Sequence, residues 1–255
     1  MPDTANRPMP RFHLYLDSAD LVELRACLPH PVLHGVTTNP TLLKRAGVTR
    51  AALPALVEQL LKLGARQVQA QVHAADVDGM LADASELIKL ADPGQLVVKI
   101  PATRAGLQAG AQLAAQGVPV TFTAVYAAEQ AHFAAQLGAA YAAPYLGRLL
   151  DAGIDGMALI AQMQSLIEQS SATTRLLVAS VRSREAFLAL LGRGVGAITV
   201  PPRLFAELLD HAATLDAERG NRDGPHPQPQ QRQKRLTRPH AGHQQPGGGD
   251  RKSVV

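Results

Sequence analysis

The sequence predicts an α/β protein built as a (β/α)8 barrel. Eight short apolar or alternating segments typical of strands occur in the first 200 residues, and each is followed by apolar residues at helical spacing. Their spacing of ~20 to 30 residues and a chain of 255 residues fit one closed barrel domain. The alternative is an open doubly wound sheet, but no Gly-x-Gly-x-x-Gly or phosphate-loop motif follows a strand.

Each element is placed by its own pattern and by the residues that bound it. The first predicted strand, 12–16, alternates and leads to Asp17, and Ser18 is a good N-cap for the helical spacing that follows. Pro40 disfavours a helical residue before it and marks the end of the second strand, 32–36. The later predicted strands are 67–72, 96–100, 118–123, 139–143, 175–179 and 196–200. The predicted helices after residue 39 are 40–46, 50–63, 77–90, 104–116 capped by Thr103, 127–137, 155–168, 184–191 capped by Ser183, and 202–211.

Lys99 stands inside an apolar run, Leu-Val-Val-Lys-Ile-Pro-Ala-Thr at 96–103, that reads as a buried strand of a parallel sheet. Burying an unpaired ammonium is costly, so such a lysine tends to become neutral. A neutral amine in an apolar pocket is the usual nucleophile for a Schiff base with a carbonyl substrate. The alternative is a lysine that snorkels from a strand end to water.

Several polar residues fall at or near the carboxyl ends of the predicted strands. In a barrel these ends converge on one face, where active sites are built. Taken singly, each has a structural explanation: Asp17 as part of a cap, Asn39 as a turn residue, Tyr145 as a buried aromatic. Together they predict one site. The set is Asp17, Asn39, Gln71, Lys99, Thr123, Tyr145 and Ser180.

Composition limits the function classes. Hydrophobic residues make up 46% of the chain, and neither an apolar run of about 18 residues nor a signal-peptide pattern occurs, so we expect a cytoplasmic protein. The net charge of +4 comes from residues 218–255, which hold eight Lys/Arg and three Asp/Glu. Residues 1–217 hold 17 bases and 18 acids, so the barrel carries no electrostatic footprint for nucleic acid. Cys27 is the lone cysteine and is expected in the core.

At these residues the chain resembles the transaldolase family, and within it the fructose-6-phosphate aldolase-like branch of small transaldolases. The matching blocks are YLDSAD (15–20), GVTTNPT (35–41), VVKIPAT (97–103), TAVY (123–126), APYLGR (143–148) and ASVR (179–182). The resemblance implies a class I aldolase-like TIM barrel that needs no cofactor and no metal. It also implies sugar-phosphate substrates and a ring-like homo-oligomer, a pentamer or decamer in relatives, in which a C-terminal helix packs on a neighbouring subunit.

The resemblance also implies roles for particular residues. Lys99 would form the imine and carry a three-carbon dihydroxyacetone unit as its enamine. Asp17 and Asn39 would hold the donor hydroxyls and the carbinolamine, with Thr38 in the same motif, while Gln71 and Thr123 would position a water that relays protons. The acceptor phosphate would be held by Arg148, Ser180 and Arg182. The alternative is that the two arginines only form part of a solvated rim and bind no phosphate.

Tyr145 and Gln71 bear on the subtype. In the family that the chain resembles, typical transaldolases have Phe at the position of Tyr145 and Glu at that of Gln71. The aldolase-like branch has Tyr and Gln, as this chain does. A phenol beside the imine can protonate the enamine carbon, so we expect an aldolase that cleaves or forms fructose 6-phosphate. Arg182 instead resembles the transaldolase phosphate site, which keeps open the transfer of dihydroxyacetone between sugar phosphates, as in the pentose phosphate pathway.

The resemblance ends near residue 217. Residues 218–255 are rich in Gln, Pro, Gly, His and Arg and hold four hydrophobic residues, so we expect a barrel domain at 1–217 and a disordered basic tail. A shifted reading frame or a divergent end would produce so abrupt a change. Two other functions stay open from sequence alone: a sugar-phosphate-binding barrel without catalysis, and a polyanion-binding tail.

Overall fold

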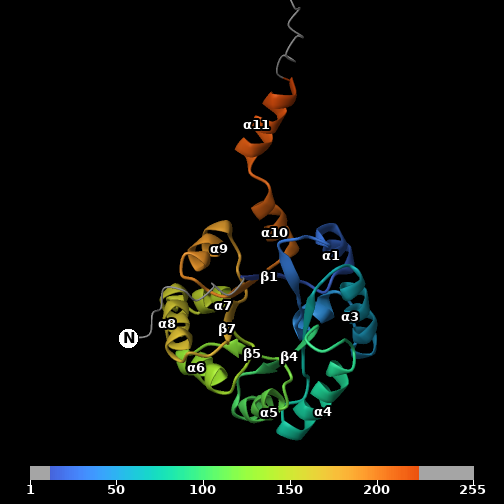
Figure 1. Cartoon of the computed structure of the whole chain (residues 1–255), viewed down its shortest axis with the longest axis vertical. Coiled ribbons are helices and arrows are strands. Elements are labelled where there is room, and N and C mark those ends of the chain that lie inside the picture. Colours follow the sequence, from blue (N-terminus) through green and yellow to red (C-terminus); the bar gives the residue numbers. More distant parts are fainter. Residues whose placement is uncertain (1–11, 224–255) are drawn as a thin grey trace, which may run out of the picture. The chain divides into compact units, whose positions relative to one another are not determined.

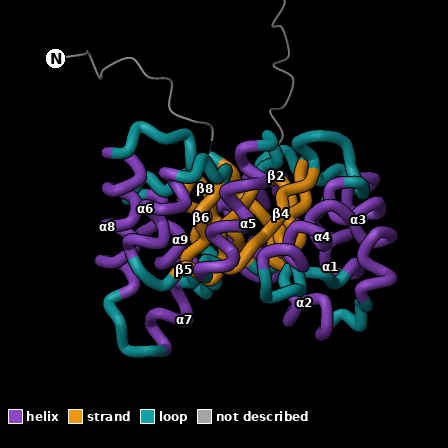
Figure 2. The backbone as a smooth tube through the Cα atoms, turned by 90° about the horizontal axis from the view of Figure 1, so that it is seen from below, coloured by secondary structure: helices purple, strands orange, loops and turns teal. Residues whose placement is uncertain are grey.

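Eight parallel strands close into a barrel in sequence order, β1 to β8, with the helices around the outside (Figures 1 and 2). The computed structural model describes residues 12–223. This confirms the predicted (β/α)8 class. The strands are β1 (His13–Asp17), β2 (Leu33–Thr37), β3 (Gln67–Gln71), β4 (Leu96–Pro101), β5 (Val120–Val125), β6 (Tyr141–Pro144), β7 (Arg175–Val178) and β8 (Ala197–Val200).

The helices follow the predicted order with small shifts at their ends. Among the predicted caps, Thr103 accepts a hydrogen bond from Gly106 N and Ser183 accepts one from Ala186 N. The helices of the barrel unit are α1 (Leu21–Cys27), α2 (Pro40–Arg45), the 3-10 turn η2 (Arg50–Ala52), α3 (Leu53–Lys62), α4 (Val77–Ile88), α5 (Arg104–Ala115), α6 (Ala128–Gln136), α7 (Leu146–Asp151), α8 (Gly156–Gln169), α9 (Arg184–Leu191) and α10 (Pro202–Leu209). Within residues 12–223, no helix is long and apolar enough to cross a membrane.

Three features differ from the sequence predictions. Asp20, not Ser18, caps α1, because its carboxylate accepts from the N–H groups of Val22 and Glu23, while Ser18 Oγ accepts from Asp20 N. Helix α7 was not predicted. The barrel unit ends at His211 and a further helix, α11 (Ala212–Asp223), belongs to a second unit, so the predicted boundary at 217 falls inside a helix. The rest of the predicted tail, 224–255, lies outside the described residues.

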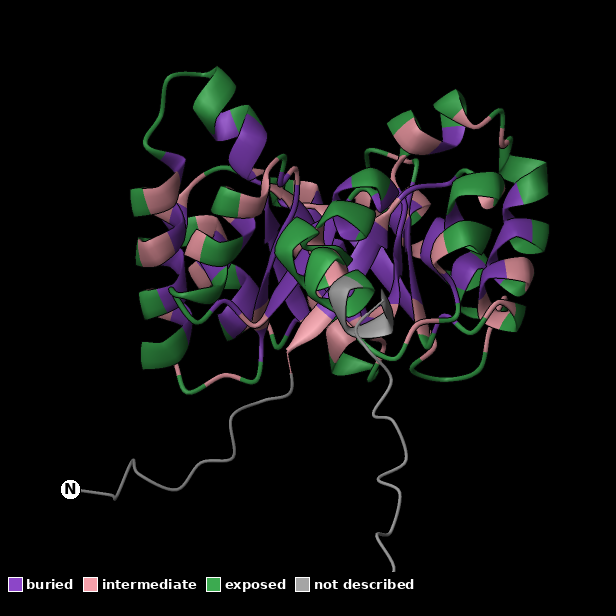
Figure 3. Ribbon diagram, turned by 90° about the horizontal axis from the view of Figure 1, so that it is seen from above, coloured by how far each residue is buried: buried purple, intermediate pink, exposed green. Residues whose placement is uncertain are grey.

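The strands separate two kinds of interior. Side chains that point outward pack under the helices as one apolar core, and the strands are mostly buried, with intermediate residues chiefly at their ends (Figure 3). Side chains that point inward are largely polar and bond across the barrel: the hydroxyls of Tyr15 and Tyr141 lie 2.7 Å apart, and Thr121 Oγ1 donates to Gln69 Oε1 at 2.9 Å. Because side chains alternate along a strand, Lys99 lies on the same inward face as Val97, two residues before it.

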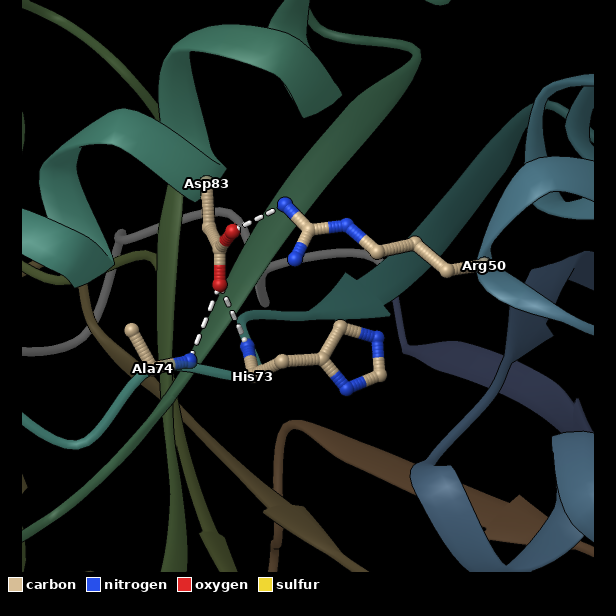
Figure 4. Close-up of polar contacts among 4 residues, drawn as sticks. All are labelled: Arg50, His73, Ala74 and Asp83. Atoms are coloured by element: carbon tan, nitrogen blue, oxygen red, sulfur yellow. Dashed lines mark hydrogen bonds and ion pairs between the residues drawn. The ribbon is translucent and has the colours of Figure 1, made fainter.

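Asp83 on α4 fixes the loop that leaves β3. Its carboxylate accepts from the backbone N–H groups of His73 at 2.8 Å and Ala74 at 2.9 Å and pairs with Arg50, as Figure 4 shows. Desolvation opposes ionisation of Asp83, but these partners outweigh it and lower its pKa. The contacts hold the chain directly after Gln71 in one conformation.

Replacing Asp83 by alanine is expected to lower the free energy of unfolding by about 1–3 kcal/mol, since two partly buried backbone donors lose their acceptor. Because the folded-state pKa of Asp83 is lowered, its contribution is present above the unfolded-state pKa of about 3.9 and lost as the pH falls below it. Urea unfolding at pH 7 and pH 3 measures both effects.

The matched control is Arg50→Ala. The Arg50 side chain is 63% exposed, so its ion pair with Asp83 is expected to contribute less than about 1 kcal/mol. Equal losses of unfolding free energy in the two variants would contradict the view that the backbone hydrogen bonds supply most of the stabilisation by Asp83.

Candidate active site

A cavity of about 360 Å³ opens at the carboxyl ends of the strands and gathers most of the predicted site residues. Lys99 and Asp17 lie in it with residues from the loops that follow β2, β6 and β7. Seven of the ten predicted residues line this cavity: Asp17, Asn39, Lys99, Tyr145, Arg148, Ser180 and Arg182.

Among the described residues, Lys99 has one side-chain hydrogen-bond partner, a backbone carbonyl. Its side-chain nitrogen donates to the carbonyl oxygen of Thr38 at 2.8 Å, and the residue is only 4% exposed. Desolvation lowers its pKa below the ordinary lysine value, and the negative charge of Asp17 opposes that shift. A larger fraction of the amine is therefore neutral at physiological pH than in a surface lysine, which is the state that attacks a carbonyl.

Asp17 ends β1 on the same inward face. It accepts a hydrogen bond from Thr37 Oγ1 at 2.8 Å, and the Thr37 hydroxyl lies 2.7 Å from that of Thr199. Desolvation raises the pKa of Asp17, while Lys99 and the Thr37 hydroxyl oppose the rise. Burial thus favours the neutral forms of both Asp17 and Lys99, and the charge of each residue opposes that effect on the other.

Tyr145 follows β6 and brings a phenol to the cavity. Its hydroxyl lies 2.7 Å from Thr123 Oγ1, and Tyr126 meets its ring edge-to-face with 5.9 Å between ring centroids. Desolvation raises the pKa of Tyr145, with the Thr123 hydrogen bond opposing. The phenol therefore keeps its proton near neutral pH and has one to donate.

Ser180 and Arg182 follow β7, which pairs with β6, so they line the cavity next to Tyr145 and close to the backbone of Gly147. Ser180 has a positive φ of 59°, an unusual conformation for a residue with a side chain and one that clusters at functional sites. Its carbonyl oxygen accepts from Gly147 N at 3.1 Å. Arg182 makes a two-pronged ion pair with Asp151, Nη1 to Oδ1 at 2.7 Å and Nη2 to Oδ2 at 2.6 Å.

Comparison with known proteins decides the family. The family model described as Transaldolase/Fructose-6-phosphate aldolase matches residues 14–241. The chain belongs to the transaldolase/fructose-6-phosphate aldolase family of enzymes. Three similar proteins are each called probable transaldolase. That of Coprothermobacter proteolyticus is 35% identical over 200 residues, which is 78% of this chain and 90% of the relative.

The other two are similar to the same extent. The Heliobacterium modesticaldum protein is 34% identical over 210 residues, covering 82% of this chain and 95% of the relative. The Thermus thermophilus protein is 35% identical over 209 residues, covering 79% of this chain and 92% of the relative. The resemblance read from the sequence motifs is therefore confirmed at the level of the family.

Gly147 is needed for the close approach of Ser180 and Arg182 to the start of α7 in this family member. A Cβ atom at Gly147 would lie 2.6 Å from Arg182 Nε and from Ser180 O, and 2.7 Å from Ser180 Oγ. Such distances are too short for non-bonded atoms, so the added methyl must displace the two residues predicted to hold a phosphate.

Gly147→Ala is therefore expected to raise the KM for a phosphorylated aldehyde by about 10-fold or more, because a misplaced guanidinium loses a charge-assisted hydrogen bond. Steady-state kinetics with glyceraldehyde 3-phosphate measures this. The control is Gly153→Ala, where the added Cβ meets nothing within 4 Å, although its φ of +73° costs some stability. A KM change of the same size in both variants would contradict the assignment to crowding.

Three predicted site residues lie outside the cavity lining. Thr123 is buried behind Tyr145, and Thr38 turns its hydroxyl to Gln69 O at 2.9 Å, so its backbone carbonyl, not its side chain, meets Lys99. Gln71 pairs in register with Lys99 but lines two other cavities, of about 390 and 330 Å³. The water-positioning role of Gln71 stays a prediction.

Other residues line the cavity without having been singled out from the sequence. Arg45 comes from the end of α2, and Asp151 from the end of α7. Asp151 stands three residues after the predicted site residue Arg148, on the same helix face, which is the signal that would have found it. Arg45 is six residues from Asn39 and shares its helix face with Leu42 instead, so the spacing from a predicted residue does not point to it. Thr41 and Leu42 complete the α2 side.

Proposed function

We propose that the chain is a class I aldolase that cleaves or forms fructose 6-phosphate through an imine on Lys99. The observation that carries the proposal is the Lys99 amine, 4% exposed and desolvated, in the same cavity as a carboxyl group whose pKa is raised. A barrel that only bound sugar phosphates would have no use for a desolvated lysine with a lowered pKa in the lining of its cavity.

The first half of the reaction uses Lys99 and Asp17 as one pair. The neutral amine attacks the ketone carbon C2, and protonated Asp17 gives its proton to the departing hydroxyl, so that water leaves and an iminium forms. The Asp17 carboxylate then takes the proton of the C4 hydroxyl. The C3–C4 bond breaks, its electron pair moves toward the iminium nitrogen, and glyceraldehyde 3-phosphate and an enamine result.

The second half regenerates the enzyme. Proton transfer from Tyr145 to C3 of the enamine gives the iminium of dihydroxyacetone, and water hydrolyses it to release dihydroxyacetone and the free amine. The hydrogen bond between Tyr145 and Thr123 supports this role, because the Thr123 hydroxyl orients the phenol and carries its replacement proton. Asn39 supplies its amide N–H to a substrate hydroxyl, since its oxygen already accepts from Leu42 N.

The second candidate is a transaldolase, in which the enamine attacks a second aldehyde phosphate before C3 is protonated. Two observations favour it: Arg182 stands in the cavity beside Ser180, and the relatives are called probable transaldolase. Sugar phosphates are substrates in both candidates. The cytoplasmic location, the pentose phosphate pathway and the ring-like homo-oligomer implied by the resemblance stay predictions.

The deciding experiment supplies fructose 6-phosphate with and without a four-carbon aldose phosphate and measures free dihydroxyacetone. An aldolase releases free dihydroxyacetone at the same rate as glyceraldehyde 3-phosphate, even without the acceptor. Strict dependence of glyceraldehyde 3-phosphate release on the acceptor would overturn the aldolase proposal in favour of transfer. Release of neither product under any condition would overturn both.

A further inference from the structure

Arg45 brings a third guanidinium to the cavity, from the side away from Ser180 and Arg182. Helix α2 begins directly after Asn39 and ends at Arg45, and residues at both ends line the cavity. Asn39 Oδ1 accepts from Leu42 N at 3.0 Å and fixes the start of this helix. Arg148 follows β6, which stands four strands from β2 in the closed barrel, so Arg45 and Arg148 approach the cavity from opposite sides.

The three arginines differ in how they are engaged. The guanidinium of Arg182 forms a bidentate salt bridge with Asp151. That of Arg148 lies over the Tyr145 ring, 5.0 Å from the ring centroid. The guanidinium of Arg45 is exposed and makes no hydrogen bond, ion pair or ring contact with another residue of the described part of the chain. Arg45 is therefore ready to bind an anion without first breaking a protein contact.

Charge matching indicates which anion. Arg182 is paired with Asp151, whereas no ion pair between described residues engages Arg148 or Arg45, so these two guanidinium groups can meet an anion in the cavity without breaking a salt bridge. A phosphate monoester carries about −1.5 to −2 charges at pH 7. The charge of two guanidinium groups therefore matches that of one phosphate monoester.

We propose that Arg45 is a specificity-determining residue that binds the phosphate of the substrate from the α2 side and so selects aldehyde phosphates over their unphosphorylated analogues. This inference rests on the proposed function for the identity of the substrate. The binding of phosphate at Arg45 itself requires no chemistry at Lys99. The two claims can therefore fail separately.

The first test measures binding of inorganic phosphate and of glyceraldehyde 3-phosphate by calorimetry in the full chain. Arg45→Gln is expected to raise the Kd for both by about tenfold, the loss of one charge-assisted hydrogen bond. Lys44→Gln is the matched control, because Lys44 is the neighbouring residue on α2, is also exposed and lies outside the lining of this cavity. Its Kd values are expected to equal those of the wild type.

The second test is kinetic and follows condensation of dihydroxyacetone with glyceraldehyde 3-phosphate or with glyceraldehyde. Arg45→Gln is expected to lower the ratio of the two kcat/KM values about tenfold, through KM, and Arg45→Lys to restore part of it. An unchanged ratio and unchanged Kd in Arg45→Gln would overturn the inference. Equal losses in Lys44→Gln would also overturn it, since they would show a general effect of helix charge.

The outcomes separate the inference from the function on which it rests. Suppose that Arg45→Gln binds phosphate more weakly but the wild type forms no borohydride-trapped adduct on Lys99. The inference about Arg45 would then hold, and the proposed aldolase function would be wrong. If an adduct forms on Lys99 and Arg45→Gln binds phosphate as the wild type does, the aldolase proposal would hold and the inference about Arg45 would be wrong.

Discussion

Replacing Lys99 by methionine is expected to abolish cleavage of fructose 6-phosphate, with a fall in kcat of about 10⁴-fold or more, because no other group replaces the nucleophile. Methionine has a similar length and places no charge in the buried site, so the barrel is expected to fold and to be at least as stable as the wild type. Activity assays combined with thermal unfolding measure both results.

The control for Lys99→Met is Lys62→Met. Lys62 is an exposed lysine on α3 whose ion pair with Glu58 is on the surface, so its loss is expected to change neither kcat nor KM. A Lys99→Met protein that is folded and retains a tenth of wild-type activity would contradict the imine mechanism.

Tyr145→Phe is expected to change the outcome of the reaction and not only its rate. Without the phenol, protonation of the enamine loses a positioned acid, and the release of free dihydroxyacetone is expected to fall by about 10²-fold. Capture of the enamine by an added aldehyde phosphate needs no proton at C3. The ratio of transfer to release is therefore expected to rise by a similar factor.

That ratio is measured from fructose 6-phosphate with a four-carbon aldose phosphate, by quantifying the new ketose phosphate and free dihydroxyacetone. Tyr126→Phe is the control. It removes the hydroxyl of a ring that packs edge-to-face on Tyr145, and it leaves the hydrogen bond between Tyr145 and Thr123 intact. Equal falls in release and transfer for Tyr145→Phe would show that the residue only shapes the cavity.

The sequence predicted the barrel and most of the cavity for one physical reason. A buried parallel strand is nearly all apolar, so a polar residue at its end is conspicuous, and closure of the barrel brings those ends together. Asp17, Lys99 and Tyr145 were found in this way, and they do line one cavity.

Other features depend on contacts that no local pattern encodes. Helix α7 has six residues and no side-chain cap, so its sequence carries neither the length nor the start signal that predicts a helix. Thr38 follows a strand end as its neighbours do, yet its hydroxyl is taken by Gln69 O. The pairing of Arg182 with Asp151 joins residues 31 positions apart and depends on the pairing of β6 with β7.

The most direct test of the central claim is mass spectrometry after borohydride reduction in the presence of fructose 6-phosphate or dihydroxyacetone. The imine mechanism predicts a reduced covalent adduct on the peptide that contains Lys99, found in the wild type and in Tyr145→Phe but not in Lys99→Met. If both compounds leave Lys99 unmodified in a folded wild-type protein, or if the adduct persists in Lys99→Met, Lys99 is not the residue that forms the imine.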